Sequence, residues 1–507
     1  MQHSLAIFSA SQIKAIDEFT IQSEPIASID LMERAASKCS QWIMKHYVVE
    51  TIFKVCCGLG NNGGDGLAIA RQLLEHGYKV EVFIIHYSDK YSHDFIVNKK
   101  RLEALYTPFI MEVNDVSHLP HFKTSDVVVD ALFGIGLSKP LFGLAAECVN
   151  HINQSAEEVI AIDVPSGLLV DSFTDKNNII VKATHALTFQ NPKLAFMFAE
   201  NYAYVGNGHV LDIGLRWTEE IQNNTHAFYV IENAVKELMK PRQKFSHKGT
   251  YGHSLLVVGS YGKMGAAIMS AHALLRSGAG LLTVCVPQCG YEIMQTSTPE
   301  AMALVEGGEY LQIKELNVSS YSSIGIGPGI GTEKETQLSV KYILESAKQP
   351  LVIDADALNA MSLNKDWLSL IPQNSILTPH PKEFERLTKV ATNDFERHHL
   401  QIEFSKQHKV YVVLKGAHTC ITTPEGESYF NSTGNSGLAK GGSGDVLTGL
   451  ITGLLAQGYS SFEASVIGVF VHGLAGDITK EEKGEVAMIP TDVINHIPTA
   501  FKRLTEV

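Results

Sequence analysis

The stretch "TIFKVCCGLGNNGGDGLAIARQLLEHGYKVEVFII", residues 51–85, decides the fold of the first part of the chain. Its first ten residues are typical of a short buried strand that ends in glycines, and 79–85 predicts a second strand. Between them, residues 65–77 have apolar side chains at helical spacing and end at a glycine. Strand, helix and strand in this order form a βαβ unit, so we predict a doubly wound α/β fold with a parallel sheet.

Three more apolar runs follow this unit at intervals that leave room for crossover helices. They are "DVVVDALFG" (126–134), "VIAIDVPSG" (159–167) and "HALTFQ" (185–190), and the strand-like "GHVLDIGL" (208–215) closes the series. The polar stretch that comes next has neither a period-2 nor a buried pattern. We therefore predict a first α/β domain that covers residues 1–218.

A second series of strands and helices begins after a basic, proline-containing arm, "KPRQKFSHKGTYG" (240–252). The series opens with "SLLVVGSYGKMGAAIMSAHALLRSGAGLLTVCVP" (254–287), and further strand-like runs lie within 323–331, 351–358, 375–384 and 410–419. Each of these runs ends in a loop rich in glycine or polar residues. We predict a second, larger α/β domain of residues 225–507, with ligands beyond the carboxyl ends of its strands.

Composition limits the classes of function. A chain of 507 residues exceeds what one core normally supports, and 45% hydrophobic with 19% charged residues is typical of a compact α/β enzyme. A net charge of -13 argues against nucleic-acid or membrane-surface partners. The seven cysteines lack paired spacing and predict reduced thiols. Since no long apolar run occurs, we expect the protein to be cytoplasmic. We also expect it to act on small molecules and to form a homo-oligomer.

The first candidate site is the glycine-rich stretch "GLGNNGGDG", residues 58–66. Glycines allow close backbone approach, and the start of the following helix offers N–H groups to a phosphate. Asp130 and Asp163 each end an apolar strand, where a carboxylate gains nothing from packing. These acids favour a site over the alternative, a tight turn in which Asp65 caps the helix. Asn62, Asp130 and Ser166 also offer oxygen ligands of low charge, which suit a monovalent cation such as K⁺ better than zinc.

The second candidate site is "NSGLAKGGSGDVLTGLITGLLAQG", residues 435–458. Gly437 to Gly442 has the spacing that opens a P-loop, but Ser443 stands where that loop needs lysine, so this interpretation fails. We predict instead that backbone N–H groups hold a phosphate while Asp445 acts as general base toward a hydroxyl. In the alternative, Asp445 only caps the helix.

Polar residues after other strands support a nucleotide site. His380 and Glu383 lie in "PHPKEF", Lys415 in "LKGAHT", and "GIGPGIG" supplies flexible backbone. Each also has a structural interpretation, as a turn residue, a surface charge or a plain loop. Together with residues 441–445 they favour a nucleotide clamped at the ends of the strands.

The motifs of the first domain resemble the bifunctional NAD(P)H-hydrate repair enzyme family. They are "NNGGDG" (61–66), "DALFGIGLSKP" (130–140) and "DVPSG" (163–167). The resemblance implies a Rossmann-like, three-layer epimerase domain with Asn62, Asp130 and Ser166 around K⁺. It implies contacts to hydrated NADH or NADPH from Asn61, Asn62, Gly63, Gly64, Asp65, Gly134, Ile135, Gly136, Leu137, Ser138, Lys139, Pro140 and Asp163. We expect Asp163 to be the catalytic acid–base group.

The second domain resembles the ribokinase-like, ADP-dependent dehydratase domain of the same family. The similar stretches are "SHKGTYG" (246–252), "MGAAIMSAHALLRSGAGL" (264–281), "GPGIG" (327–331), "DADALN" (354–359), "LTPHPKEF" (377–384), "LKGAHT" (414–419) and "GNSGLAKGGSGDVLTG" (434–449). The resemblance implies an α/β/α fold in which Ala266, Gly329, His380 and Asp445 contact the hydrate. It implies that Lys415, Gly416, Ala417, His418, Thr419 and Gly444 contact an adenine nucleotide, ADP with Mg²⁺.

The predicted activity is the repair of hydrated NADH and NADPH. Phosphorylation turns the 6-hydroxyl of the hydrate into a good leaving group, and an epimerase supplies the one epimer that the dehydratase accepts. The sequence leaves open whether epimerisation loses hydroxide or opens the ring. One alternative is a vitamin or sugar kinase with a regulatory first domain, and another makes that domain a non-catalytic scaffold.

Overall fold

The computed structural model describes residues 4–105 and 109–506, which fold into two compact units. The smaller unit comprises residues 6–225 and 393–395. The larger unit comprises 226–392, 396–506 and the first described residues. The functional limits of 1–218 and 225–507 stay a prediction.

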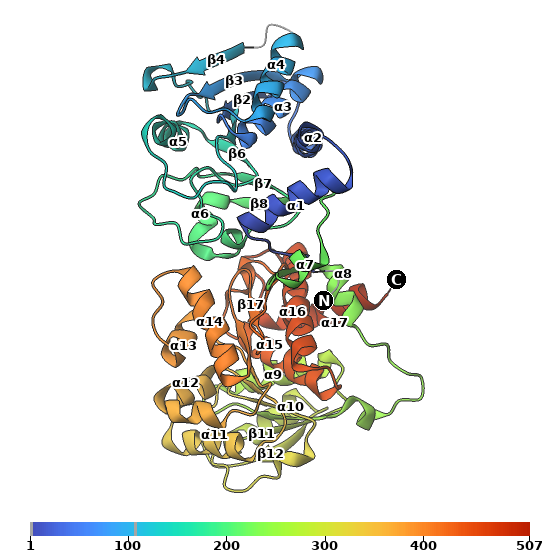
Figure 1. Ribbon diagram of the computed structural model, residues 1–507. Helices are drawn as coiled ribbons and strands as arrows, with labels where there is room; N and C mark the ends of the chain where they lie inside the picture. The colour runs from blue at the N-terminus through green and yellow to red at the C-terminus, as the bar shows by residue number, and fades with distance from the viewer. Residues whose placement is uncertain (1–3, 106–108, 507) are drawn as a thin grey trace. The chain divides into compact units, whose positions relative to one another are not determined.

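A seven-stranded sheet forms the centre of the smaller unit, in the order β4-β3-β2-β5-β6-β7-β8 (Figure 1). The strands are β2 (Ile52–Cys57), β3 (Lys79–Ile85), β4 (Phe109–Val113), β5 (Asp126–Ala131), β6 (Glu158–Ile162), β7 (His185–Phe189) and β8 (Asn207–Leu211). Every neighbouring pair is parallel, with Val55 opposite Val82 and Val129 in register. The parallel sheet predicted from the apolar runs is therefore confirmed, and the carboxyl ends of all seven strands lie along one edge.

Helices pack on both faces of this sheet. α2 (Ser28–His46), α3 (Asn61–Glu75) and α4 (His93–Leu105) share a core with one face, and α5 (Gly143–Ser155) shares a core with the other. Successive residues of β2 alternate between the two cores, as Val55 and Cys56 do. The remaining helices are α1 (Ala10–Ser23), α6 (Tyr202–Val205) and α7 (Glu219–Asn223). The three-layer fold is confirmed, but the helix expected between β6 and β7 is wrong, because residues 163–184 contain none.

The larger unit contains an eleven-stranded sheet in the order β1-β9-β18-β17-β16-β15-β14-β13-β10-β11-β12. Its strands are β1 (Leu5–Ala6), β9 (Ala227–Val230), β10 (His253–Val257), β11 (Leu281–Val286), β12 (Met302–Val305), β13 (Ser323–Ile326), β14 (Leu351–Ile353), β15 (Ile376–Leu377), β16 (Tyr411–Leu414), β17 (Cys420–Thr422) and β18 (Ser428–Asn431). The strands from β16 to β12 are parallel to one another. β17 runs antiparallel between β16 and β18, an arrangement that the sequence did not predict.

Two helical layers enclose the larger sheet. α9 (Met264–Ser277), α15 (Ser443–Ala456), α16 (Ser461–Lys483) and α17 (Pro490–Thr505) pack on one face, and α11 (Lys334–Ser346), α12 (Ala355–Leu363), α13 (Pro381–Leu387) and α14 (Asp394–His408) pack on the other. The remaining α-helices of this unit are α8 (Glu232–Leu238) and α10 (Tyr291–Ser297). The predicted α/β/α architecture of the second domain is confirmed.

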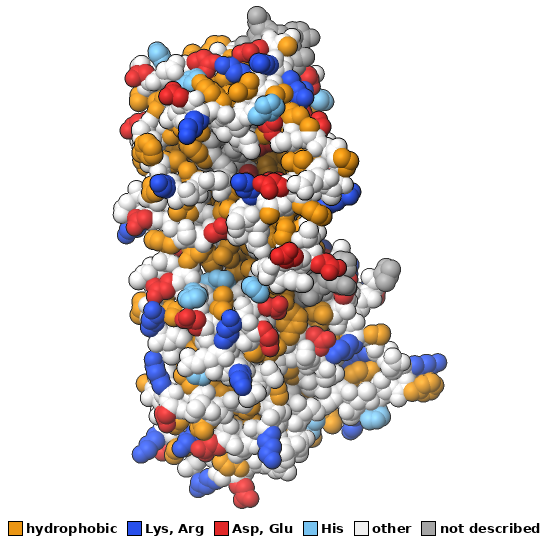
Figure 2. Space-filling view, viewed as in Figure 1, with side chains coloured by type: hydrophobic (Ala, Val, Ile, Leu, Met, Phe, Trp, Pro, Cys, Tyr) orange, Lys and Arg blue, Asp and Glu red, His pale blue; other side chains and the backbone are white. Residues whose placement is uncertain are grey.

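Three further features of the structure can be compared with the expectations from the sequence. The basic arm at 240–252 projects from the larger unit and presents basic and apolar side chains to solvent (Figure 2). Phe245 of this arm is almost fully exposed. Among the residues that the structure describes, α16 alone is long and apolar enough to cross a membrane by length and composition, and 72% of its most apolar window is buried. All seven cysteines are free thiols, as predicted, and only Cys289 is not fully buried.

Candidate functional site

The glycine-rich stretch of the smaller unit forms the start of α3 itself. Gly60 is the N-cap residue and no side chain caps the helix. A Cβ atom on Gly63 would lie 1.8 Å from the carbonyl oxygen of Gly58, so only glycine lets the helix begin this close to the preceding loop. Asp65 lies buried within the helix, where burial raises the pKa of its carboxyl well above the usual value. The alternative in which Asp65 caps the helix is therefore wrong.

Asp163 directly follows β6 and lies against a buried lysine. Its backbone is left-handed, with φ of +64°, a conformation that residues other than glycine rarely adopt. Oδ1 of Asp163 accepts a hydrogen bond from the Thr188 hydroxyl at 3.3 Å and lies 3.3 Å from Nζ of Lys193. The Lys193 ammonium also donates to the Thr188 hydroxyl at 2.8 Å and to the carbonyls of Phe189 and Asn191. These contacts fix both charges of the pair.

Asp17 of α1 adds a second carboxyl group near Asp163. Burial and the charge of Asp163 together raise the pKa of Asp17 to about 7, and the Lys193 ammonium opposes this rise. A carboxyl group that titrates near neutral pH beside a fixed carboxylate is typical of proton transfer. The arrangement can therefore exchange a proton with a bound hydroxyl group.

The proposed cation ligands lie around the loop that follows β5. Oδ1 of the buried Asp130 accepts a hydrogen bond from the Ser166 hydroxyl at 2.7 Å, and Oδ2 accepts one from the Ser166 N–H at 2.8 Å. The Ser166 hydroxyl oxygen in turn accepts from the Phe133 N–H at 2.9 Å. Burial raises the pKa of Asp130 to about 6, although these hydrogen bonds oppose the rise. Asp130 and Ser166 thus form one unit beneath the loop.

Gly134 brings Asn62 and Asp163 together. A Cβ atom at Gly134 would lie 3.3 Å from Oδ2 of Asp163 and 3.5 Å from Oδ1 of Asn62. Both polar atoms of the Asn62 amide are buried without a hydrogen-bond partner in the described part of the chain. An unpaired buried amide is costly, so this side chain fits a ligand or cation that completes its bonding. The rest of the predicted loop, Ile135, Gly136, Leu137, Ser138, Lys139 and Pro140, is irregular and largely exposed.

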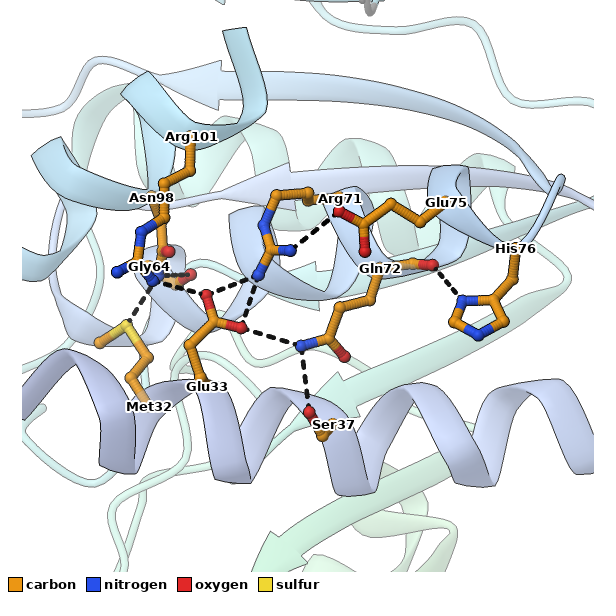
Figure 3. Close-up of polar contacts among 10 residues, drawn as sticks. All are labelled: Met32, Glu33, Ser37, Gly64, Arg71, Gln72, Glu75, His76, Asn98 and Arg101. Atoms are coloured by element: carbon orange, nitrogen blue, oxygen red, sulfur yellow. Dashed lines mark hydrogen bonds and ion pairs between the residues drawn. The ribbon is translucent and has the colours of Figure 1, made fainter. Parts of the chain in front are cut away.

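A polar network holds the start of α3 in place (Figure 3). The buried side chain of Asn98, on α4, donates from Nδ2 to the Gly64 carbonyl at 3.1 Å. Glu33, on α2, accepts from Arg71 of α3 at 2.5 Å and from Arg101 of α4 at 2.9 Å (Figure 3). The helices α2, α3 and α4 are therefore tied together along α3, from Gly64 in its first turn to Arg71 in its second half.

The corresponding position in the larger unit is the start of α15. Gly442, with φ of +97°, is the N-cap residue, and no side chain caps this helix. Asp445 lies in its first turn, so the interpretation of Asp445 as a cap is wrong. Burial and the Asp354 carboxylate together raise the pKa of Asp445 to about 7, and the Lys415 ammonium opposes this rise. The N–H of Ser443 donates to the Lys440 carbonyl at 3.3 Å, and the N–H groups of Gly444 and Asp445 have no backbone partner among the described residues and are available to a phosphate.

Lys415 and Asp354 form an ion pair next to this helix. Nζ of Lys415 lies 2.9 Å from Oδ1 of Asp354, whose Oδ2 accepts a hydrogen bond from the Thr448 hydroxyl at 2.7 Å. Burial would lower the pKa of Lys415, but the carboxylates of Asp354 and Glu383 outweigh it and raise the pKa. A Cβ atom on Gly444 would lie 3.2 Å from the Lys415 ammonium. Lys415 and Gly444, both predicted nucleotide contacts, are thus brought together.

The glycine loop after β13 joins the same region through Asp356. Oδ2 of Asp356 accepts from the Gly331 N–H at 2.9 Å and lies 3.2 Å from Nζ of Lys263, which precedes α9. The charge of Asp356 also contributes to the raised pKa of Asp445. Gly329 and Ala266 pack closely, since a Cβ on Gly329 would lie 3.0 Å from that of Ala266.

The other predicted residues of this unit have structural contacts of their own. Nδ1 of His380 accepts from the N–H groups of Lys382 and Glu383 and so caps α13, which agrees with the turn interpretation. Gly416, Ala417, His418 and Thr419 form the turn between β16 and β17. The contact of each with a hydrate or a nucleotide stays a prediction.

Comparison with known proteins also divides the chain into two domains. A family model described as YjeF-related protein N-terminus matches residues 28–195, and one described as NAD(P)H-hydrate dehydratase matches residues 254–499. The chain is 33% identical to the bifunctional NAD(P)H-hydrate repair enzyme Nnr of Moorella thermoacetica over 99% of this chain and 97% of that protein. The chain belongs to this family.

Other members of the NAD(P)H-hydrate repair family are about as similar. The Escherichia coli enzyme is 30% identical over 92% of this chain and 88% of its own length. Among solved structures, an ADP/ATP-dependent NAD(P)H-hydrate dehydratase from Bacillus subtilis, co-crystallised with ATP and Mg²⁺, is 32% identical. It covers 54% of this chain and 97% of its own, with a TM-score of 0.48.

Four polar residues of the two sites were missed by sequence reasoning. Lys193 and Asp17 flank Asp163, and Asp354 and Thr448 hold Lys415. Asp354 ends a buried strand in the same way as Asp130 and Asp163 do, so that signal was present. Lys193, Asp17 and Thr448 give no such signal, because their roles depend on tertiary packing.

Proposed function

We propose that this chain converts hydrated NADH and NADPH back to the reduced dinucleotides with two active sites. The smaller unit interconverts the R and S epimers, and the larger unit dehydrates the S epimer at the expense of ADP. The observation that carries the proposal is the match of both family models, in order, to two units that each contain a helix beginning at a glycine N-cap without a side-chain cap.

In the smaller unit, Asp163 acts as the acid–base group for the 6-hydroxyl. The ring nitrogen of the hydrate expels the hydroxyl while a carboxyl group protonates it, so that water leaves. Water then adds to the other face and returns a proton to the carboxylate. Lys193 positions Asp163, and Asp17 is a nearby proton reserve with a pKa of about 7. A ring-opening route would use the same groups.

In the larger unit, Asp445 takes the proton of the same hydroxyl group. The hydroxyl oxygen attacks the β-phosphorus of ADP, and the bond from that phosphorus to AMP breaks. The ring nitrogen then expels phosphate from carbon 6, and a proton leaves carbon 5, which gives NAD(P)H, AMP and phosphate. The α15 N-terminus and Lys415 stabilise the charge that develops on the phosphoryl group.

The residues present fit the implied ions. K⁺ would be held by Asn62, Asp130 and Ser166, where the unpaired Asn62 amide oxygen fits a weakly demanding cation, and it would order the loop after β5. No group of three His, Cys, Asp or Glu side chains able to hold a metal occurs in the described chain. Mg²⁺ would be held mainly by the nucleotide phosphates next to Asp354, and it would supply positive charge there.

The test is recovery of NADH absorbance from each epimer in the presence of ADP or ATP. We expect both epimers to be converted, with stoichiometric release of inorganic phosphate and a preference for ADP, which the bacterial and archaeal order of the two domains favours. Asp163→Asn should abolish conversion of the R epimer alone, and Asp445→Asn should abolish conversion of both. A stable phosphorylated product would instead identify a small-molecule kinase, and indifference to Asp163→Asn would identify a scaffolding first domain.

A further inference from the structure

A cavity opens at the carboxyl edge of the smaller sheet, beyond the strands β3 and β4. Its volume is about 590 Å³, and its lining includes His86, Tyr87, Asp89, Tyr91, Glu112 and Asn114. Cavities of this size accept small organic ligands. None of these residues was predicted to bind a ligand, and none belongs to the catalytic groups described above.

The cavity adjoins the glycine-rich start of α3. The hydroxyl oxygen of Tyr87 accepts a hydrogen bond from the Leu59 N–H at 3.3 Å, and the Tyr87 ring lies 4.7 Å from the ring of Phe133. Leu59 belongs to the loop before α3, and Phe133 precedes Gly134 in the loop that reaches Asp163. The Tyr87 side chain therefore lines the cavity and also contacts the two loops of the epimerase site.

The distance along the sheet suits a dinucleotide. β3 and β6 are separated by three strand spacings, roughly 14 Å, and both end at the same edge. A ligand whose nicotinamide ring meets Asp163 after β6 has its pyrophosphate near the α3 N-terminus between these strands. Its other nucleoside then reaches the end of β3, where the cavity lies.

The lining has the chemistry that recognises a nucleoside. The Tyr91 hydroxyl contacts Nδ1 of His86 at 3.2 Å, and Nε2 of His86 contacts Glu112 at 2.5 Å, so these side chains already satisfy one another. Lys99 occupies the other oxygen of Glu112 at 2.5 Å. Asp89 is exposed and has no side-chain hydrogen bond or ion pair among the described residues. It is the carboxylate that remains available to accept from the two hydroxyls of a ribose.

We propose that this cavity binds the adenosine half of the hydrated dinucleotide, and that Asp89 makes the epimerase site prefer hydrated NADH over hydrated NADPH. The proposal rests on the function proposed above. An aromatic wall at Tyr87 and Tyr91 receives the base, and Asp89 accepts from the ribose diol. A 2′-phosphate would face the Asp89 carboxylate, which no lysine or arginine pairs among the described residues, whereas Glu112 is already paired with Lys99.

The experiment compares the two hydrates as R epimers with the full chain and ADP. Excess Asp163→Asn protein, which keeps an intact dehydratase site, is added so that epimerisation limits the rate. We expect kcat/KM for hydrated NADH to exceed that for hydrated NADPH by about tenfold, equivalent to about 1.4 kcal/mol. Asp89→Arg should reverse this preference, and Asp89→Asn should reduce it without a reversal.

The control is Glu157→Arg, which makes the same change of charge at the exposed opposite end of the sheet, before β6. It should leave the ratio of the two hydrates unchanged. A ratio that stays within twofold of wild type in both Asp89 variants would overturn the proposal, provided that the wild type epimerises. Failure of the wild type to convert any R epimer, with the S epimer converted normally, would instead refute the proposed epimerase.

Discussion

Replacement of Lys193 by methionine tests how the epimerase acid is held. Lys193 is only 1% exposed, and its ammonium lies 3.3 Å from the Asp163 carboxylate, which is 11% exposed. Methionine keeps most of the length of the side chain but removes the charge and every hydrogen bond it donates. Asp163 would then be a nearly buried carboxylate without a counter-ion, on a strained backbone.

The structure sets the size of the expected effect. Two unit charges 3.3 Å apart attract each other by about 5 kcal/mol at an effective dielectric constant of about 20. Loss of one partner of a buried ion pair costs about 3–5 kcal/mol because the other charge stays buried. We therefore expect Lys193→Met to lower the free energy of local opening around Asp163 by about 3–5 kcal/mol. Asp163→Asn alone should also destabilise, and the double variant should lose at least about 1 kcal/mol less than the sum of the two.

Native-state hydrogen exchange of the full chain measures these changes at β6 and β7, and β13 and β14 of the larger unit provide an internal reference. Epimerase turnover of Lys193→Met should fall by about 10²-fold, since small errors of position have effects of this size. Lys182→Met, at an exposed lysine of the same unit, is the matched control. Additive effects in the double variant, or wild-type exchange and turnover in Lys193→Met, would refute the reasoning.

Three further predictions concern the remaining groups. Below about pH 7, kcat/KM of the dehydratase should fall tenfold per pH unit as Asp445 becomes protonated. Asp354→Asn should move this fall to lower pH, because it removes a negative charge that raises the pKa of Asp445. A profile that does not move would contradict the assignment of Asp445 as the base. Gly63→Ala should abolish epimerisation, because its Cβ would collide with the backbone oxygen of Gly58. Gly60→Ala should stay active, because a Cβ at that position has no other atom within 4 Å. Equal activities of the two variants would show that the close packing at Gly63 is not required. Exchange of K⁺ for tetramethylammonium should lower turnover of the R epimer but not of the S epimer. Asn62→Ala should remove this cation dependence. A wild-type enzyme whose R-epimer turnover does not depend on the cation would exclude the proposed ion.

The sequence predicted those parts of the two sites that follow from strand order. Asp130 and Asp163 could be located because an acid at the end of an apolar run must lie at the carboxyl edge of a parallel sheet. Lys193 could not, because a lysine is normally exposed and only the folded chain shows this one buried beside Asp163. The missing helix between β6 and β7 has a similar cause, since residues 163–184 pack as irregular chain whose apolar side chains still fill the core. Strands of two to four residues, such as β15 and β17, leave too short a pattern to define their direction.

The two acids differ in the charges nearest to them, and this difference fits their different tasks. Asp445 lies near Asp354 and Asp356, whose negative charges help to raise its pKa to about 7. A base of this strength can take the hydroxyl proton and keep it while a phosphoryl group, itself negative, is transferred beside it. Asp163 has an ammonium group at 3.3 Å and a second carboxyl group, that of Asp17, which titrates near neutrality. An epimerase must give back every proton that it takes, so a carboxylate paired with both a fixed cation and a proton reserve suits a reaction that runs in both directions.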